Sequence, residues 1–349
     1  MISQNLRGIG ICGPAASTPG NASEILVVDN LIGTDSTGLR GFGNAFEGIR
    51  IDNSADNTIQ GNAAGSQVIW ENQVGVALIG IQAAGNLLDG NLIGSDNTGK
   101  NDLGNKNEGV LIEGAYNNTI GGTTAAALNL ISANHWGVRL DGKSAKDNLV
   151  EGNLIGTDIT GKAPLGNEVN GVIVNNNAFS NTIGGTVSGA GNTIAFNVLA
   201  GVSVQSGTGD SILSNSIYSN DQLGIVLVTP SPVPGPNDLQ TAPVLTSAVG
   251  GGTSSGIQGT LASIANTPFL IQFFTSLIPD PSGFGQGQTP IGSTTVTTNR
   301  QGNAAISFAP SSSLPANIWV TATATNTLTG DTSEFSNALS ALYRSRCSS

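Results

Sequence analysis

The stretch Asn30-Leu-Ile-Gly-Thr-Asp-Ser-Thr-Gly38 decides the fold, because nearly the same nine residues return twice more. The later copies occupy residues 91–99 and 153–161, so the copies begin about 61 residues apart. A fixed period of this length indicates one supersecondary unit that is stacked on copies of itself. The chain is therefore predicted to contain a solenoid, in which a residue present in every copy is explained more simply by structure than by catalysis.

A shorter signal lies inside each unit: a glycine followed by aliphatic residues at alternate positions. Its clearest instances begin at Gly48, Gly75, Gly109, Gly137, Gly171, Gly201 and Gly224. Successive side chains of a strand point to opposite faces, so the first and third residues after each glycine share one face. Both of these columns are aliphatic throughout, whereas the column between them includes arginine and serine. We therefore expect one interior face, with Val110 and Val138 among its residues.

Two further strand signals follow in each unit, most of them an asparagine before a short aliphatic run. Examples are Asn57-Thr-Ile and Asn91-Leu-Ile. Three short strands per turn with glycine and asparagine corners indicate a parallel β-helix, and stacked asparagines can form amide ladders along its axis. The predicted fold class is all-β: a right-handed parallel β-helix of about seven to eight coils over residues 1–228, followed by an antiparallel β-sandwich.

The combined pattern NLIGTD-x-TG, LGN, GV-x-I, NTIGGT and G-x-GN-x-I resembles the right-handed parallel β-helix repeat proteins of bacterial surfaces and secretomes. Pectate-lyase-like proteins share this scaffold. The resemblance covers about residues 2–228 and implies the fold. It implies no single activity, because the same scaffold carries lyases, hydrolases, epimerases, adhesins and proteins without a known reaction.

The composition changes after Val228. Residues 229–236 hold four prolines, which cannot continue a hydrogen-bonded ladder, so a linker is predicted there. Residues 237–343 alternate short strands with turn residues, which favours an immunoglobulin-like β-sandwich, and residues 344–349 are predicted to be a tail. The sandwich strands are expected at 243–249, 255–262, 269–276, 291–299, 303–309, 318–326 and 332–339.

The chain is acidic and sparsely charged. Only 10% of its 349 residues are charged, and 12 basic against 23 acidic residues give a net charge of −11. No basic stripe is present to meet phosphates, which argues against a nucleic-acid partner. No apolar run reaches the length of a membrane span. The two cysteines, Cys12 and Cys347, lie at opposite ends of the sequence and lack metal-ligand spacing.

The first residues read like the middle of a repeat. Ile2-Ser-Gln-Asn5 matches Ile131-Ser-Ala-Asn134, so we expect further coils and an export signal upstream of Met1. The protein is then expected outside the cell or on its surface. An uncapped first coil exposes ladder groups, and self-association at that coil is a further expectation.

The repeated aspartates Asp35, Asp96 and Asp158 are candidate metal ligands. They sit in glycine-rich loops, and hard oxygen ligands of this kind suit Ca²⁺. The alternative is that each carboxylate caps backbone amides of its own loop. One aspartate per loop is a small ligand set, which favours the capping interpretation.

Charged residues that interrupt the outward face of the glycine-led strands are the candidate catalytic groups. Glu113 and Asp141 are expected on successive coils, about 5 Å apart. Arg139 lies two residues before Asp141, and His135 is the only histidine. Paired carboxylates suit a retaining glycosidase or a shared cation, and an arginine or histidine suits a base in polysaccharide cleavage. The alternative is a solvated acidic strip with salt bridges between residues i and i+2.

Arg50 and Asp52 repeat the arginine–aspartate pair on another coil and are candidate ligand-binding residues. Trp70 and Trp136 are also candidates, because aromatic rings stack on sugars. Both tryptophans are expected near the third strand of alternate coils, where they either bind sugars or shield a corner.

Two functions are compatible with this sequence. The first is an extracellular or cell-surface β-helix protein that acts as a structural, adhesive or glycan-contact module, with a polysaccharide as its partner. The second is a carbohydrate-active enzyme, a polysaccharide lyase or glycoside hydrolase, that uses the outward strip of Glu113, Arg139 and Asp141. The uniform outer face and the C-terminal sandwich favour the first function.

Overall fold

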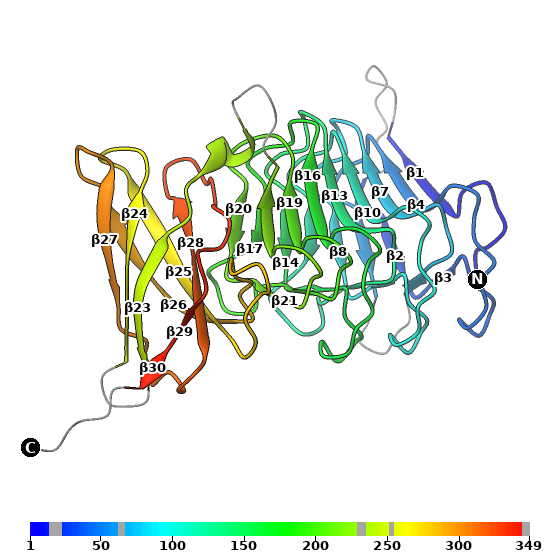
Figure 1. Ribbon diagram of the computed structural model, residues 1–349. Coiled ribbons are helices and arrows are strands. Elements are labelled where there is room, and N and C mark those ends of the chain that lie inside the picture. The colour runs from blue at the N-terminus through cyan, green and yellow to red at the C-terminus, as the bar shows by residue number, and fades with distance from the viewer. Residues whose placement is uncertain (14–22, 62–66, 229–234, 251–254, 344–349) are drawn as a thin grey trace, which may run out of the picture.

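The computed structural model describes residues 1–13, 23–61, 67–228, 235–250 and 255–343. Three parallel sheets wind into an elongated β-helix, and two antiparallel sheets lie against its C-terminal end (Figure 1). The predicted all-β class, with about seven to eight coils followed by an antiparallel part, is confirmed. Most of the expected linker at 229–236 and the whole expected tail at 344–349 lie outside the described residues.

Each coil contributes one strand to each of three sheets, which we call the first, second and third sheets, except that the last coil contributes only to the first. The first sheet contains β1 (Ile9–Cys12), β4 (Glu47–Asp52), β7 (Val74–Ile79), β10 (Glu108–Glu113), β13 (Trp136–Asp141), β16 (Val172–Asn175), β19 (Val202–Val204) and β22 (Ile225–Leu227). The second contains β2 (Leu26–Val28), β5 (Thr58–Gln60), β8 (Leu87–Asp89), β11 (Thr119–Gly121), β14 (Leu149–Glu151), β17 (Thr182–Gly184) and β20 (Ser211–Leu213). The third contains β3 (Leu31–Ile32), β6 (Val68–Ile69), β9 (Leu92–Ile93), β12 (Leu130–Ile131), β15 (Leu154–Ile155), β18 (Thr193–Ala195) and β21 (Ser216–Tyr218).

The interior of the β-helix is a continuous aliphatic core. Val110 pairs with Val138, and Ile112 with Leu140, so that like residues stack from coil to coil. Val110 and Val138 are fully buried, as the alternating pattern predicts. Removing these columns from water is the main favourable term in folding, and the in-register parallel strands satisfy the backbone between them.

Buried asparagines form hydrogen-bonded ladders at the corners of the coils. In each ladder, the backbone N–H and the Nδ2 of one asparagine generally donate to the Oδ1 of the asparagine on the next coil, as Asn118 does to Asn148 at 3.0 and 3.1 Å. The first ladder runs through Asn44, Asn72, Asn105, Asn134, Asn167, Asn197 and Asn220. The second runs through Asn57, Asn86, Asn118, Asn148, Asn181 and Asp210. The third runs through Asn91, Asn129, Asn153, Asn192 and Asn215.

The repeated NLIGTD-x-TG segments form loops that cover the outer face of the third sheet. Each loop is a small hairpin, closed by the antiparallel bridges Thr34↔Gly41, Ser95↔Asp102 and Thr157↔Pro164. An apolar cluster lies beneath them, formed by Val68, Trp70, Leu92, Leu130 and Leu154 with Leu31, Leu103, Leu128 and Ile159.

The loops also contact one another along the axis of the β-helix. Asn97 Nδ2 donates to Thr37 O at 3.0 Å, and Ile159 N donates to Gly99 O at 2.9 Å. They therefore form a second layer of repeats outside the third sheet, with one loop for every two coils.

The C-terminal part consists of two four-stranded sheets around its own apolar core. One sheet contains β23 (Val244–Gly250), β24 (Gly256–Ala262), β27 (Asn303–Phe308) and β30 (Leu342–Tyr343). The other contains β25 (Pro268–Ser276), β26 (Thr289–Thr297), β28 (Trp319–Asn326) and β29 (Leu339–Ser340). All the strand pairs are antiparallel except the short β23–β30 pair.

The expected strand at 332–339 does not form as a continuous ladder: Thr332 and Asn337 make isolated bridges, and only the last residue, Leu339, belongs to a strand, β29. This segment is instead used at the junction with the β-helix. Thr332 Oγ1 accepts from Ile212 N at 2.9 Å, and Glu334 Oε1 accepts from Leu227 N at 2.9 Å. Contacts with the last coil have replaced a regular ladder here.

The C-terminal part caps the open end of the β-helix. Phe274 and Phe335 belong to the same apolar core as the β-helix interior, and their rings meet edge to face at 5.3 Å. Gln286 continues the first asparagine ladder, because its Oε1 accepts from both N and Nδ2 of Asn220 at 3.1 Å. The 3-10 turn η1 (Pro236–Leu239) does the same for the second ladder through Asn237. Backbone groups that would otherwise be orphaned are thus paired.

Candidate functional site

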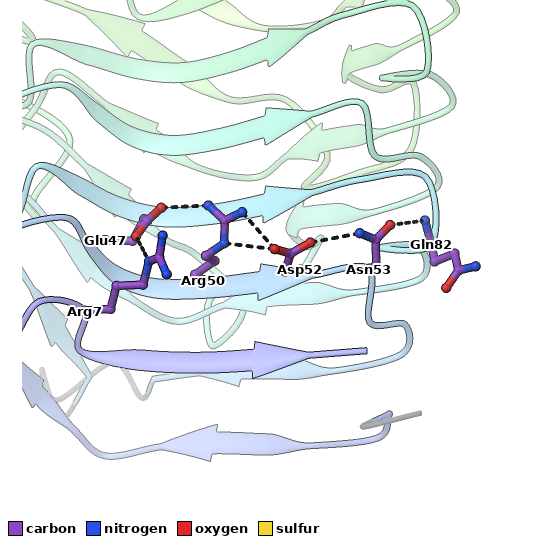
Figure 2. A network of polar contacts seen from close by, with 6 residues as sticks. All are labelled: Arg7, Glu47, Arg50, Asp52, Asn53 and Gln82. Atoms are coloured by element: carbon purple, nitrogen blue, oxygen red, sulfur yellow. Dashed lines mark hydrogen bonds and ion pairs between the residues drawn. The ribbon is translucent and has the colours of Figure 1, made fainter. Parts of the chain in front are cut away.

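The outward face of the first sheet carries a chain of polar contacts near the N-terminal end (Figure 2). Arg50 of β4 lies between two carboxylates of its own strand. Its Nη1 is 2.9 Å from Glu47 Oε1, and its Nη2 is 2.8 Å from Asp52 Oδ2. Arg7 adds a second cation to Glu47, at 2.8 Å. The whole network comprises Arg7, Glu47, Arg50, Asp52, Asn53 and Gln82.

These contacts fix the charges of the network. Burial by itself would raise the pKa of Glu47, but hydrogen bonds from its own N–H, Arg50 and Arg7 outweigh burial and lower that pKa. Burial opposes the charge of Arg50, yet the bonds to Asp52 and Glu47 raise the pKa of its guanidinium. Glu47 and Arg50 are therefore permanently charged partners at neutral pH.

A second arginine on the same sheet is held in the same way. Arg139 of β13 places Nη1 3.0 Å from Glu108 Oε1 on the neighbouring strand and Nη2 3.4 Å from Asp141 Oδ1 on its own strand. The guanidinium also lies 5.7 Å from the ring of Trp136. Asp141 accepts a further bond from Asn176 Nδ2 at 2.7 Å.

Three of the predicted catalytic residues come together, and the fourth does not. Glu113 and Asp141 occupy paired positions on β10 and β13, as expected, and Arg139 lies beside Asp141. His135 precedes β13, six residues before Asp141, which corresponds to about 20 Å of extended chain. His135 instead meets Glu168, with Nδ1 2.8 Å from Oε2. A mechanism that joins His135 to the Glu113–Asp141 pair is therefore not supported by this geometry.

The two tryptophans have different environments: Trp70 directly follows the third-sheet strand β6, as the sequence predicts, whereas Trp136 lies several residues past the third-sheet strand β12. Trp70 is fully buried beneath the repeat loops and has no exposed ring face to offer a sugar, which removes it from the candidate ligand-binding residues. Trp136 begins β13 in the first sheet and is partly exposed. Its ring is 4.2 Å from that of His135, in an edge-to-face arrangement. Trp136 thus adds an aromatic surface to the strip that contains Arg139.

The repeated aspartates hold their own loops together. Asp96 Oδ1 accepts from Thr98 N at 3.2 Å and from Lys100 N at 3.3 Å, and its Oδ2 accepts from Asn101 Nδ2 at 2.7 Å. Burial raises the pKa of Asp96, but these hydrogen bonds outweigh burial and lower it. Asp35 and Asp158 accept equivalent bonds from the residues two and four positions later. In the described residues, no group of three or more metal-ligating side chains gathers. The geometry supports the capping interpretation.

The sequence reasoning missed the two glutamates that hold the arginines. Glu47 and Glu108 each precede the glycine that opens a first-sheet strand, and they lie one repeat period apart. Both glutamates are largely buried, so their ion pairs with the arginines are screened less by solvent and salt than ion pairs between exposed charges. The sequence does contain a signal for these two residues, because an acidic residue recurs directly before Gly-Ile and Gly-Val.

No known family model matches this sequence. No curated protein is similar to it at a significant level. In the part of the chain that the structure describes, no helix has the length and apolar character that a membrane crossing requires.

Proposed function

We propose that this chain is a non-catalytic surface module that contacts glycans through the outward strip of the first sheet. We define the strip by Arg50, Asp52, Glu113, Trp136, Arg139 and Asp141. The observation that carries the proposal is that each arginine of the strip is held between two carboxylates. Such an arginine is a fixed hydrogen-bonding group and is poorly suited to act as a base.

Rigid presentation supports a binding role. Asparagine ladders at three corners and a capped C-terminal end hold the first-sheet strands in register. Arginine–carboxylate pairs next to a partly exposed tryptophan offer donors, acceptors and a ring face together, which is the combination that sugars use. The proposal includes an extracellular or cell-surface location. We also propose that the β-helix is right-handed and of the pectate-lyase-like kind, and that the C-terminal part is an immunoglobulin-like β-sandwich.

The test is a binding and turnover screen of neutral glycans and polyuronates, with and without Ca²⁺. We expect retention on at least one polysaccharide, reduced at least about fivefold by Trp136→Ala, which corresponds to about 1 kcal/mol. Thr294→Ala, on the outer strand β26, is the matched control and should bind like the wild type. Absence of binding to every glycan would overturn the glycan-contact role.

An enzyme is the second candidate, and one observation favours it. Glu113 and Asp141 are paired in register, so their backbones are about 4.8 Å apart, and Arg139 is adjacent. Carboxylates at this spacing suit a retaining glycosidase, and an arginine can stabilise charge in polysaccharide cleavage. Release of unsaturated or reducing ends that disappears with Glu113→Gln would replace the binding proposal with this one.

Self-association at the first coil is part of the proposal. Strands β1 and β2 are the outer strands of the first and second sheets, whereas the outer edge of β3 already pairs with Ile2. Leu6, Leu26 and Phe46 are exposed at this end. Unpaired strand edges next to apolar side chains favour pairing with another chain. Light scattering should show a mass that rises with concentration, and a constant monomer mass would refute this part.

A further inference from the structure

The second asparagine ladder ends in an acid. In its asparagine rungs, Nδ2 donates forward to Oδ1 of the next rung, and from Asn86 onward it also donates back to a backbone carbonyl. The backward acceptors are Ser54 O for Asn86, Ala83 O for Asn118, Ala115 O for Asn148 and Ala145 O for Asn181. The next rung is Asp210, which the series would otherwise fill with asparagine.

Asp210 reproduces only half of the ladder chemistry. Its Oδ1 accepts from N and Nδ2 of Asn181, both at 3.0 Å, and its own N donates to Asn237 Oδ1 at 2.9 Å. Its Oδ2 takes the place of the asparagine Nδ2, and this atom is buried without a hydrogen-bond partner among the described residues. From the Nδ2 contacts of the other rungs, we infer that Oδ2 points toward the acceptors Ala178 O and Asn237 Oδ1. An ionised carboxylate can only repel these two acceptors, whereas a protonated one donates its single O–H to one of them.

The charged groups around Asp210 are acidic. Asp331 accepts from Gly209 N at 2.6 Å, so its carboxylate lies one residue away from Asp210. Burial and the charge of Asp331 raise the pKa of Asp238 in η1. Burial, assisted by the charge of Asp331 and opposed by the hydrogen bonds from Asn181, raises the pKa of Asp210 to about 7.

This rung is also where the C-terminal part is attached to the β-helix. Asn237 Nδ2 donates to Asp210 O at 2.7 Å and to Thr332 O at 3.1 Å, so it connects the two parts. Ser211 Oγ donates to Gly330 O at 2.9 Å directly beside it. A change in the charge of Asp210 therefore acts on the contacts that seat the cap on the last coil.

We propose that Asp210 is protonated in the folded protein and serves as a pH-sensitive clasp between the β-helix and its C-terminal cap. The protonated carboxyl completes the ladder into Asn237. Loss of the proton leaves three acceptors facing one another, and the clasp loosens as the pH rises.

Proton linkage sets the direction of the effect. The unfolded carboxyl ionises near its ordinary pKa of 3.8, whereas the folded one holds its proton to about pH 7. Between these values the unfolded state binds fewer protons, so the folding equilibrium constant falls by up to about tenfold per pH unit. The stabilising contribution of protonated Asp210 is complete below pH 3.8 and is lost progressively above that value. Beyond pH 7 the loss levels off.

The test compares wild type, Asp210→Asn and Asp221→Asn by chemical unfolding from pH 4 to 8.5. Asp210→Asn supplies the Nδ2 that the other rungs have, so we expect equal stability near pH 4 and a growing advantage for the variant toward pH 8. The folding equilibrium constant of Asp210→Asn should exceed that of the wild type at least about 100-fold at pH 8. Asp221→Asn changes an exposed aspartate near the same end and should behave like the wild type.

A second measurement does not depend on any variant. The Cγ chemical shift of Asp210 in ¹³C-aspartate-labelled wild type should titrate near pH 7. A midpoint below pH 5, or parallel stability profiles for wild type and Asp210→Asn, would overturn the proposal. Both readouts are independent of glycan binding, so they stand or fall separately from the proposed function.

Discussion

Replacing Asn148 with alanine tests whether the ladders carry the stability of the coils. Asn148 is buried and makes four side-chain hydrogen bonds: two accepted from Asn118 at 3.0 and 3.1 Å, and one each donated to Ala115 O at 3.1 Å and Asn181 Oδ1 at 3.0 Å. In Asn148→Ala, Asn118 Nδ2 keeps other acceptors, and Asn181 Oδ1 still accepts from Asn148 N. Two groups lose their bonds to the Asn148 side chain without such a replacement: the N–H of Asn118 and the carbonyl of Ala115.

An unsatisfied buried group costs about 1–3 kcal/mol, so the two together should cost about 4 kcal/mol of unfolding free energy. That is a large share of the roughly 5–15 kcal/mol that stabilises a typical domain. The measurement is urea unfolding followed by circular dichroism, with hydrogen exchange at the Asn118 amide as a local readout. Asn107→Ala, at a partly exposed position of a coil, is the control and should stay within about 0.5 kcal/mol of wild type. A loss below about 1 kcal/mol for Asn148→Ala, with an unchanged m-value, would refute the reasoning.

Two further predictions concern the backbone and the repeat loops. Gly94 has φ +96°, and a Cβ there would lie 1.9 Å from Ser132 O, so Gly94→Ala should cost about 3 kcal/mol in thermal unfolding. Gly10→Ala, with nothing within 4 Å, should cost much less, and equal losses would contradict the argument. Asp96→Ala removes the cap of its loop and should lower the unfolding free energy by about 1–2 kcal/mol. Addition of Ca²⁺ or EDTA should leave the melting temperatures of variant and wild type unchanged. Because the pKa of Asp96 is lowered, the extra stability of the wild type over Asp96→Ala should be present above pH 3.8 and should vanish as the pH falls through the folded pKa of Asp96. A rise of the wild-type melting temperature with Ca²⁺ that Asp96→Ala abolishes would restore the metal interpretation.

The repeat predicted the core because its period leaves little choice. A strand with aliphatic residues at alternate positions must turn them inward, and like residues then stack, as Val110 and Val138 do. The pairing of Glu113 with Asp141 was predictable for the same reason, since both are counted from an equivalent glycine. Strand period and register are thus sufficient to derive the core and this pairing from the sequence.

Features that depend on the path of loops could not be derived in this way. Trp70 is buried because the repeat loops fold back over the third sheet, and strand alternation contains no information on that path. His135 meets Glu168, a residue 33 positions later on another coil, instead of the nearby Asp141. The segment at 332–339 has the alternation of a strand, but contacts with the last coil of the β-helix determine its conformation.

The stacked outer loops restrict how a protein of this design can change length. Asn97 reaches back to Thr37, and Ile159 to Gly99, so each loop needs a neighbour two coils away. Genetic duplication or loss of one coil would leave the core continuous but would put the outer layer out of phase. Deleting residues 91–152, one full period, should close up cleanly, whereas removing a single coil should leave a loop open to proteases. The evolutionary building block is therefore a pair of coils.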